Sequence, residues 1–492
     1  MKVSAKSFDK HDFIDFLVEK KILKFGDFIL KSGRRAPFFL NFGEVCDGGS
    51  LSTLGNFYAN EVSKLDIEEI KGSTTFLMGP SYKGIPIAVS TAISLAEYEG
   101  MEFPYSFDRK EEKLHGEVSD KASLAKKLFV GYIPKEGDRA ILLDDVVTTG
   151  ETKKEEVDKL KALGVKCIEL ITSVDREELD ENANDPAISL ESKIGLSPKS
   201  IIGFISDAVP YLVDKGIING KTKQKILAYS RAFGIERVKG WCREQRLIEK
   251  LDKGIIVSCD APIDISERAI KATAKILEVV AYKFGFESLI GGLDKWVSLA
   301  RKYTDKPIIY DHQKAGTDIP DTGRRFMEII KQAGADAVII FPQSGPATQW
   351  EWIYSAFEQD LEVLAGGGMT HTKYKRSEGG YIADDALLEM YALSAKAGVN
   401  NFIVPGNKVE DIAVYKKVIE NTVSGIKASF FSLGLVTQGG EISEAAKVAG
   451  DRWYPILGRA IYGDVNRIGR YHDADEMSSA AYRYSSRVKA FK

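Results

Sequence analysis

The chain contains few cysteines and no long apolar run. Its four cysteines are widely separated and show neither a disulfide framework nor a metal-ligand spacing; they are Cys46, Cys167, Cys242 and Cys259. A reducing, intracellular compartment follows from this usage. No segment approaches the ~20 apolar residues of a membrane span, and residues 1–6 contain no apolar stretch of signal-peptide length. We therefore expect a soluble, cytoplasmic protein.

The chain also has almost no net charge. Its 68 basic and 71 acidic residues give a formal charge of −3, which excludes a bulk basic field for nucleic acid or a membrane surface. Local clusters of Lys and Arg can still bind a phosphorylated metabolite, so we expect small-molecule partners. Low-complexity tracts are absent, and 492 residues with 44% hydrophobic content suffice for two or three domains with full cores.

The first half of the chain alternates strand-like and helical segments. Apolar runs at 74–79, 140–143 and 165–172 predict buried strands, and residues 151–163 predict the helix that follows the second run. Residues 109–127 are charged and poorly periodic, which is typical of a long active-site lid. This alternation favours an α/β fold with an open, mostly parallel sheet.

Composition changes after residue 180. Residues 180–200 are polar, and a helical pattern then runs from 201 to 237. We therefore expect a first domain at 1–205, a helical connector at 206–245 and a second domain at 246–492.

The second half has a different rhythm. Short apolar runs, separated by helical patterns, recur at 254–258, 307–310, 337–341, 361–365, 401–405, 428–433 and 454–458, with a weaker run around 284–290. Eight strand–helix repeats in about 245 residues predict a (β/α)₈ TIM barrel, whose active site lies at the carboxyl ends of the strands.

The most informative motif is the run at 141–152. Three apolar residues lead into Asp144 and Asp145, and then into a turn that contains Thr148, Thr149 and Gly150. Backbone N–H groups of such a turn, at the start of a helix, suit a phosphate. Paired carboxylates suit ribose hydroxyls or a diphosphate that carries Mg²⁺. The alternative is an ordinary strand-to-helix turn.

This run resembles the phosphoribosyl-diphosphate signature of type I phosphoribosyltransferases. Residues 31–39, 79–86, 109–117 and 174–177 resemble motifs of orotate phosphoribosyltransferases in the same order, and the resemblance spans roughly residues 10–235. It implies the type I phosphoribosyltransferase fold. It also implies a Mg²⁺ ion held mainly through the ligand and water, without direct protein ligands.

The resemblance also implies two sets of contacts. Those to phosphoribosyl diphosphate are Lys31, Tyr82, Lys83, Arg109, Lys110, Lys113, His115, Asp144, Asp145, Thr148, Thr149, Gly150 and Thr152. Those to orotate are Phe38, Phe39, Thr148 and Arg176. The cationic groups between 109 and 115 would stabilise charge on a departing diphosphate. Other interpretations stay open: a solvated loop at 109–117, core packing for the two Phe residues, and a surface salt bridge for Arg176.

Polar residues follow the apolar runs of the second half. They are Asp260, Lys283, Asp311, Lys314, Asp318, Thr370, Gln438 and Arg459. Carboxylates in a closed site repel a substrate carboxylate, and interleaved lysines keep them ionised. An ammonium beside a forming carbanion stabilises it and can then protonate the same carbon, without any metal or organic cofactor. The alternatives are surface ion pairs for the cluster, and a turn with an ion pair for Gln438 and Arg459.

This half resembles orotidine 5′-monophosphate decarboxylases over roughly residues 250–480. By that resemblance Lys314 is the proton donor, and Asp311, Lys283 and Asp318 complete the charged network, with Asp318 supplied by a partner subunit of an obligatory dimer. The substrate contacts would be Asp260 and Thr322 for the ribose, Thr370 for the pyrimidine edge, and Gln438, Gly458 and Arg459 for the phosphate.

The spacing around the lysine differs from the family pattern Asp-x-Lys-x-x-Asp. Here Asp311, Lys314 and Asp318 are each one residue further apart. On a strand the longer spacing puts Asp311 and Lys314 on opposite faces. We therefore predict a bulge or early turn near residues 312–314, which Gly316 makes easier. We expect His312 to fill the extra space rather than to take part in catalysis.

Together the two halves resemble bifunctional uridine 5′-monophosphate synthases, because the product of the first reaction is the substrate of the second. Two alternatives stay open. The barrel could be a Mg²⁺-dependent sugar-phosphate decarboxylase or aldolase, or the first half could be a non-catalytic nucleotide-sensing domain. The sequence leaves open whether both sites are active, whether the intermediate is channelled, and the size of the oligomer beyond a dimer.

Overall fold

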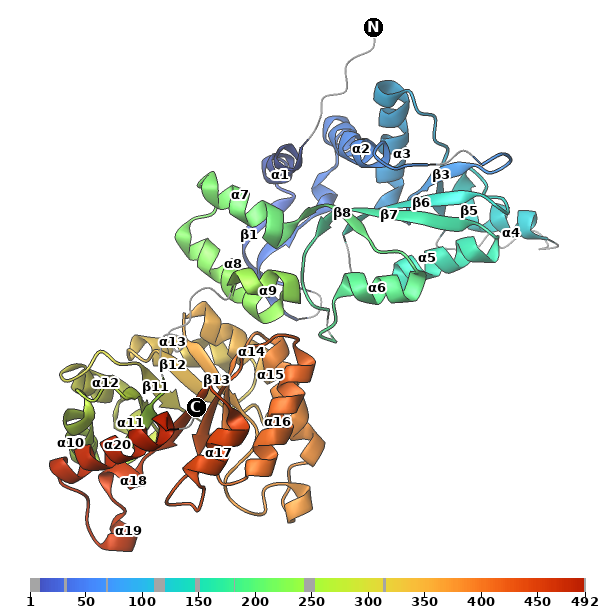
Figure 1. Ribbon diagram of the computed structural model, residues 1–492. Coiled ribbons are helices and arrows are strands. Elements are labelled where there is room, and N and C mark those ends of the chain that lie inside the picture. The colour runs from blue at the N-terminus through green and yellow to red at the C-terminus, as the bar shows by residue number, and fades with distance from the viewer. Residues whose placement is uncertain are drawn as a thin grey trace. The chain divides into compact units, whose positions relative to one another are not determined.

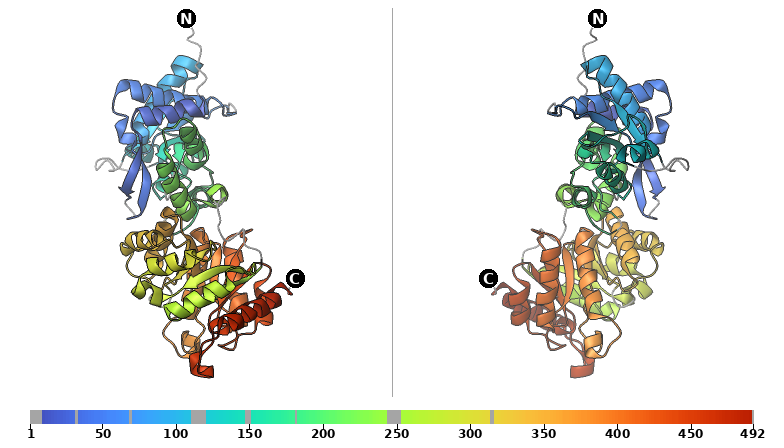
Figure 2. Two further views of the ribbon diagram at one scale, coloured as in Figure 1. Left: turned by 90° about the vertical axis from the view of Figure 1, so that its left-hand side faces the viewer. Right: turned by 90° about the vertical axis from the view of Figure 1, so that its right-hand side faces the viewer.

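The computed structural model describes residues 9–30, 33–67, 70–109, 120–146, 151–180, 182–242, 253–312 and 316–490. The chain divides into two compact units, Met1–Ser230 and Arg231–Lys492. The division falls inside helix α8 (Gly220–Phe233). Figures 1 and 2 show an open sheet with helices in the first unit and a ring of strands inside helices in the second.

The first unit is built on an open six-stranded sheet with the strand order β5-β4-β3-β6-β7-β8. All neighbouring pairs are parallel except β4 and β5. The strands are β3 (Thr75–Met78), β4 (Tyr105–Asp108), β5 (Phe129–Gly131), β6 (Arg139–Val146), β7 (Lys166–Asp175) and β8 (Lys199–Gly203). A separate antiparallel pair joins β1 (Leu23–Ile29) and β2 (Arg35–Leu40).

Helices cover both faces of this sheet. Figure 1 shows α2 and α3 on one face and α5 and α6 on the other. The helical segments are α1 (Lys10–Glu19), η1 (Phe42–Glu44), α2 (Gly48–Val62), α3 (Gly84–Ser94), η2 (Leu95–Glu99), α4 (Lys121–Leu128), α5 (Glu151–Ala162), α6 (Pro186–Ile194), η3 (Phe204–Ala208) and α7 (Val209–Asp214). Apolar side chains of β3, β6, α4, α5 and α6 form one continuous core beneath the sheet.

The predicted strands and the predicted helix of this unit are confirmed, with two corrections. Residues 121–127 of the predicted lid belong to α4, because Asp120 and Ser123 make a reciprocal capping box at its start. Residues 201–203, assigned to a helical pattern, belong to strand β8, whose Ile201 and Ile202 are buried. A short apolar run of this kind fits a strand or a helix equally well by periodicity alone.

The second unit is a closed barrel of eight strands in the order β9 to β16, with β16 pairing back to β9. Every pair is parallel, which confirms the predicted (β/α)₈ fold. The strands are β9 (Ile255–Ser258), β10 (Val279–Phe284), β11 (Ile308–Asp311), β12 (Ala337–Ile340), β13 (Glu362–Gly366), β14 (Asn401–Pro405), β15 (Ser429–Leu433) and β16 (Trp453–Leu457). Alternate apolar side chains fill the interior.

The strand predicted around residues 284–290 was placed too late in the chain. The second barrel strand is Val279–Phe284, and residues 286–291, expected in a strand, form helix α11. The run at 279–282 follows helix α10 without a glycine or proline between them, so its apolar residues read as a continuation of the helix.

Helices surround the barrel (Figure 1). The helical segments of the second unit are α9 (Glu236–Cys242), α10 (Ile263–Thr273), α11 (Phe286–Gly291), α12 (Leu293–Arg301), α13 (Thr322–Gln332), α14 (Pro346–Glu358), η5 (Arg376–Glu378), α15 (Asp384–Lys396), α16 (Val409–Thr422), α17 (Ile442–Ala449), α18 (Arg459–Tyr462), α19 (Val465–Ile468) and α20 (Ala474–Lys489). Within the described ranges, none of the chain's helices has the length and apolar character needed to cross a bilayer.

Candidate active sites

The carboxyl end of β6 carries the paired carboxylates of the first unit. The Asp145 carboxylate lies 2.7 Å from Nζ of Lys83, and the Asp144 carboxylate lies 2.7 Å from Nζ of Lys153. Lys83 is exposed, whereas the side chain of Lys153 is only 4% exposed. Each carboxylate is therefore paired with its own ammonium, which fixes its direction.

The sequence did not predict two contacts at the end of β6, one made by Lys153 and one by Tyr58 with the backbone of Asp144. Nζ of Lys153 also donates to the carbonyl of Val146, so it braces the end of β6 twice. The buried Tyr58 hydroxyl donates to the carbonyl of Asp144 at 2.5 Å and contacts Oγ of Ser173 at 2.6 Å. The signal for Lys153 was available, because a lysine two residues into the helix after the motif can turn back onto the strand end.

A buried acidic cluster lies at the end of β4, next to Arg109. Asp108 and Glu156 are almost fully buried, and Nζ of Lys159 lies 2.7 Å from Asp108 and 3.5 Å from Glu156. Burial and the neighbouring Asp108 carboxylate raise the pKa of Glu156 to about 8. Burial would raise the pKa of Asp108 too, but contacts with Glu156, Lys159 and Ser81 lower it to about 2.

This cluster connects separate parts of the predicted transferase site. The backbone N–H of Ser81 donates to the Asp108 carboxylate at 2.9 Å. Ser81 precedes Tyr82 and Lys83, and Asp108 precedes Arg109. Tyr82 is 67% exposed, and the buried Nε of Arg109 has no hydrogen-bond partner among the residues that the structure describes.

The predicted orotate contacts lie in different surroundings. Phe38 is fully buried and stacks on Phe204, with a ring-centroid distance of 3.8 Å. Its ring is packed in the core in this structure. Phe39 is partly exposed and stacks on Phe28. The guanidinium of Arg176 lies 4.6 Å from the centre of the Phe38 ring and pairs with Glu178 at 2.7 Å.

Several predicted contacts lie outside the described residues. They are Lys31, Lys110, Lys113, His115, Thr148, Thr149, Gly150 and, in the barrel, Lys314. Thr152 belongs to the first turn of α5, but its side chain is likewise outside the description.

The centre of the barrel mouth is a buried ammonium between two carboxylates. Nζ of Lys283, on β10, lies 2.6 Å from Asp311 at the end of β11 and 2.9 Å from Asp260 just after β9. Lys283 and Asp311 are fully buried. Burial alone would lower the pKa of Lys283, but Asp260 and Asp311 outweigh it and raise that pKa above its usual value. The three strands therefore bring the predicted charges together.

Neighbouring residues that the sequence did not single out fix Asp260. Oγ of Ser258 donates to its carboxylate at 2.9 Å, and the Tyr462 hydroxyl donates to its carbonyl at 3.0 Å. A Cβ placed on Gly285 would lie 2.3 Å from Oδ1 of Asp260. Gly285 is therefore needed for the carboxylate to reach Lys283.

His312 faces away from this array. Its ring lies 4.3 Å from the Phe326 ring and 6.0 Å from the Trp352 ring, measured between centroids, and its Nδ1 lies 3.1 Å from the Tyr310 hydroxyl. Burial lowers the pKa of His312 to about 4, so the ring is neutral at pH 7. The packing role expected for His312 agrees with these contacts.

Strand β11 ends at Asp311. The N–H of His312 still bonds to β12, and its carbonyl accepts from the N–H of Gly316 at 3.2 Å. Gly316 has a φ of +76°, which favours glycine. The predicted bulge or early turn falls on residues 312–314, of which 313 and 314 lie outside the described residues.

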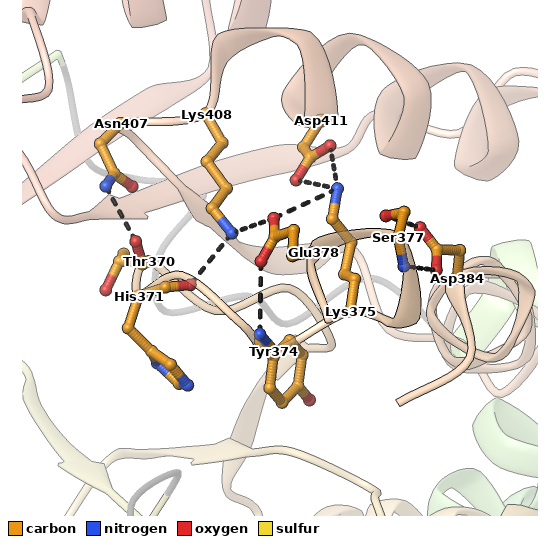
Figure 3. A network of polar contacts seen from close by, with 10 residues as sticks. All are labelled: Thr370, His371, Tyr374, Lys375, Ser377, Glu378, Asp384, Asn407, Lys408 and Asp411. Atoms are coloured by element: carbon orange, nitrogen blue, oxygen red, sulfur yellow. Dashed lines mark hydrogen bonds and ion pairs between the residues drawn. The ribbon is translucent and has the colours of Figure 1, made fainter. Parts of the chain in front are cut away.

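The remaining predicted substrate contacts follow the ends of β11, β13, β15 and β16. Asp318 is exposed and Thr322 begins α13. Thr370 follows β13, and its carbonyl accepts from Nδ2 of Asn407 (Figure 3). Gln438 is exposed after β15.

The last two predicted contacts follow β16. Gly458 and Arg459 lie at the start of α18, and Arg459 pairs with Asp464 at 3.1 Å. A bound phosphate would compete with this ion pair. Over the described ranges, no three His, Cys, Asp or Glu side chains gather as a metal site.

Two family models match the chain in succession. The model of the phosphoribosyl transferase domain matches residues 57–208, and that of the orotidine 5′-phosphate decarboxylase / HUMPS family matches residues 254–473. Both matches confirm the resemblances drawn from the motifs.

Individual relatives match the first half. The orotate phosphoribosyltransferase of Bifidobacterium adolescentis is 41% identical over 38% of this chain and 78% of its own length. That of Agathobacter rectalis is 37% identical over 46% of this chain and 97% of its own length. A solved orotate phosphoribosyltransferase from Francisella tularensis is 28% identical and covers 45% of this chain and 98% of its own, with a TM-score of 0.38. The chain thus belongs to the orotate phosphoribosyltransferase family and carries, in the same polypeptide, an orotidine 5′-phosphate decarboxylase domain, as bifunctional uridine 5′-monophosphate synthases do.

Proposed function

We propose that the chain catalyses two consecutive steps of pyrimidine nucleotide synthesis. In the first, ribose 5-phosphate passes from phosphoribosyl diphosphate to a ring nitrogen of orotate, and diphosphate leaves. In the second, orotidine 5′-phosphate loses its carboxylate as CO₂ and gains a proton on the same carbon. One observation supports the proposal most strongly. The first half of the chain belongs to the orotate phosphoribosyltransferase family, and the second half matches the orotidine 5′-phosphate decarboxylase family, whose substrate is the product of the first reaction.

In the transferase site, Asp144 and Asp145 would hold the ribose hydroxyls. Their ion pairs with Lys153 and Lys83 support this role, because they fix the direction of both carboxylates before the substrate binds. The transition state resembles an oxocarbenium ion with charge developing on the departing diphosphate. Arg109 and the cationic residues of 110–115 would stabilise that charge, with Lys31, Tyr82, Thr148, Thr149, Gly150 and Thr152 as further contacts.

Mg²⁺ fits this site only as part of the substrate. The carboxylates at the end of β6 are each taken by a lysine, so they offer no set of direct metal ligands. When bound with the diphosphate, Mg²⁺ would offset its negative charge. Phe39, Thr148 and Arg176 would contact orotate, with Arg176 pairing with its carboxylate. Phe38 would support Arg176, because its ring packs against the Arg176 guanidinium.

In the barrel, Asp311 and Lys283 would set the electrostatics around the substrate carboxylate. The buried Asp311 would repel that carboxylate and favour its departure, and Lys283 would hold Asp311 in place through their ion pair. Lys314 would then protonate the carbanion. Asp318 of a partner subunit would complete the charged network, Asp260 and Thr322 would hold the ribose, and Thr370 would contact the base. Gln438, Gly458 and Arg459 would bind the phosphate.

The same proposal covers three wider features. The catalytic parts are residues 1–205 and 246–492, joined by 206–245. The chain acts as a homodimer or a larger homo-oligomer in the cytoplasm. The decarboxylase step needs no cofactor.

The test supplies orotate, phosphoribosyl diphosphate and Mg²⁺, and measures both CO₂ release and uridylate. Orotidine 5′-phosphate with a chelator is assayed in parallel. Decarboxylation that persists in the chelator supports the metal-free barrel reaction, whereas a Mg²⁺-dependent sugar-phosphate enzyme would show none. Failure to form orotidine 5′-phosphate would refute the transferase, as a purely nucleotide-sensing domain predicts.

A further inference from the structure

The loop that carries Thr370, residues 367–383 between β13 and α15, is held by polar side chains from outside the loop. We call it the Thr370 loop. Nδ2 of Asn407 donates to the carbonyl of Thr370 at 2.9 Å, and Nζ of Lys408 donates to the carbonyl of His371 at 3.1 Å. Both donors follow β14, and Figure 3 shows them reaching across to the loop. Two consecutive carbonyls are thus fixed by side chains from the next strand end.

Lys408 is itself held by a charged chain that leads to α16. Its Nζ lies 2.7 Å from Glu378, which also accepts from the N–H of Tyr374 at 3.3 Å. Lys375 lies 3.8 Å from Glu378 and 2.8 Å from Asp411 on α16. The positive charges of two ammonium groups are therefore balanced by the negative charges of two carboxylates. Figure 3 shows the four groups as one continuous network.

The charges of this network are well shielded from water. The side chains of Lys375, Glu378, Lys408 and Asp411 are between 16% and 24% exposed. The hydrogen bond from Lys408 lowers the pKa of Glu378, so the Glu378 carboxylate is ionised at pH 7. Partly buried, hydrogen-bonded pairs restrict the backbone more than exposed pairs do.

Thr370 has little freedom once these bonds are made. A Cβ placed on Gly434, after β15, would lie 2.6 Å from Cγ2 of Thr370. The side chain of Thr370 is therefore packed against one neighbouring strand end while its carbonyl is bonded to another. The hydroxyl of Tyr374, further along the loop, accepts from Nε2 of Gln343 at 2.7 Å.

We propose that Lys408, paired with Glu378, is a positioning residue that sets the place of Thr370 and so controls how the barrel recognises the base of its nucleotide. This inference rests on the proposed decarboxylase and assigns a role to residues that do not contact the substrate. Lys408 acts only through the backbone of the Thr370 loop.

The test is a double-mutant cycle between Lys408→Met and Thr370→Val. Steady-state decarboxylation of orotidine 5′-phosphate and equilibrium binding of uridine 5′-monophosphate are measured for both single variants and the double variant. Lys408→Met should raise KM and the Kd of the nucleotide about tenfold, as expected for loss of a charge-assisted hydrogen bond, with a smaller change in kcat. In the Thr370→Val background it should add less than about twofold.

Three controls make the outcome decisive. Lys447→Met removes an exposed lysine paired with Glu444 on α17, and should change neither constant. Lys408→Arg keeps the charge and should recover most of the loss. Thermal unfolding of the same preparations, followed by circular dichroism, shows whether the barrel of each variant is folded.

Additive losses in the cycle, or wild-type constants for Lys408→Met, would overturn the positioning role while leaving the decarboxylase intact. A wild-type chain that binds uridine 5′-monophosphate but releases no CO₂ would instead overturn the reaction. In that case the double-mutant cycle on the Kd of uridine 5′-monophosphate would still test whether Lys408 positions Thr370.

Discussion

At the scale of single residues, the barrel site depends on a glycine, Gly285, which has no side chain. Gly285 leaves room for the Asp260 carboxylate, which Lys283 and Ser258 hold from two other directions. Its φ of −94° is one that alanine adopts without strain. Gly285→Ala should therefore fold and displace Asp260, lowering kcat/KM for decarboxylation by about ten- to a hundredfold.

The matched control for this change is Gly48→Ala, because a Cβ there meets no atom within 4 Å. It should leave both activities unaltered. Orotate transfer by Gly285→Ala should equal that of the wild type. A Gly285→Ala enzyme with normal kcat/KM would show that the Asp260–Lys283 contact is not needed in the form seen here.

At the scale of elements, helix α5 meets β4 through the acid pair of Glu156 and Asp108. A Glu156 pKa of about 8 means that the folded chain holds a proton which the unfolded chain loses near pH 4.5. Between these values the folded state binds one proton more, so the free energy of unfolding falls as pH rises, by up to ~1.4 kcal/mol per pH unit. This contribution is complete below pH 4.5 and lost above about 8.

Glu156→Gln should remove that dependence. The amide resembles the protonated acid, so the variant should match the wild type only below about pH 4.5, become progressively more stable than it up to about pH 8, and keep that advantage above pH 8. The measurement is the midpoint of thermal inactivation of orotate transfer, taken from pH 6 to pH 9. The Asp108 pKa of about 2 acts only in acid and leaves this window unaffected. Parallel curves for both proteins would refute the assignment of the proton to Glu156.

Much of the architecture could be predicted from the sequence, because strands that are buried on both faces appear as apolar runs that end in polar residues. Asp144 and Asp145, and likewise Lys283 and Asp311, occupy such ends. The spacing of Asp311 and Lys314 predicted a distortion next to His312, but not the bond from the N–H of Gly316 to the His312 carbonyl. Glu156 was missed because it lies on a helix face whose packing depends on the distant strand β4, whereas Lys153 lies close enough to the motif to have been found.

At the scale of the whole molecule, two sites on one chain permit a test of their independence. Asp144→Asn with Asp145→Asn removes both carboxylates at the end of β6. It should reduce orotate transfer by more than about a hundredfold and leave decarboxylation of added orotidine 5′-phosphate unchanged. Both rates are measured on one preparation. Retained transfer would refute the ribose contact, and a parallel loss of decarboxylation would show that the units do not fold independently.

The proposed dimer gives a second test at this scale. If Asp318 serves the site of the partner subunit, Lys314→Ala and Asp318→Asn should each abolish decarboxylation alone. Mixing the two variants and allowing subunits to exchange should restore activity, because a hybrid dimer contains one site with both residues intact. Random exchange makes half of the dimers hybrids, so the activity should approach about a quarter of the wild-type value.

Orotate transfer should stay at the wild-type level, since neither substitution lies in the first unit, and circular dichroism shows whether the substituted barrel is folded. A mixture of Lys314→Ala with Lys283→Met is the matched negative control. Both of these residues would serve the same site, so no hybrid dimer has a complete one. If the Asp318→Asn mixture stays as inactive as this control after exchange is shown by differently tagged subunits, Asp318 acts within its own chain. The exposed position of Asp318 in the single chain would then reflect a loop that closes over its own barrel.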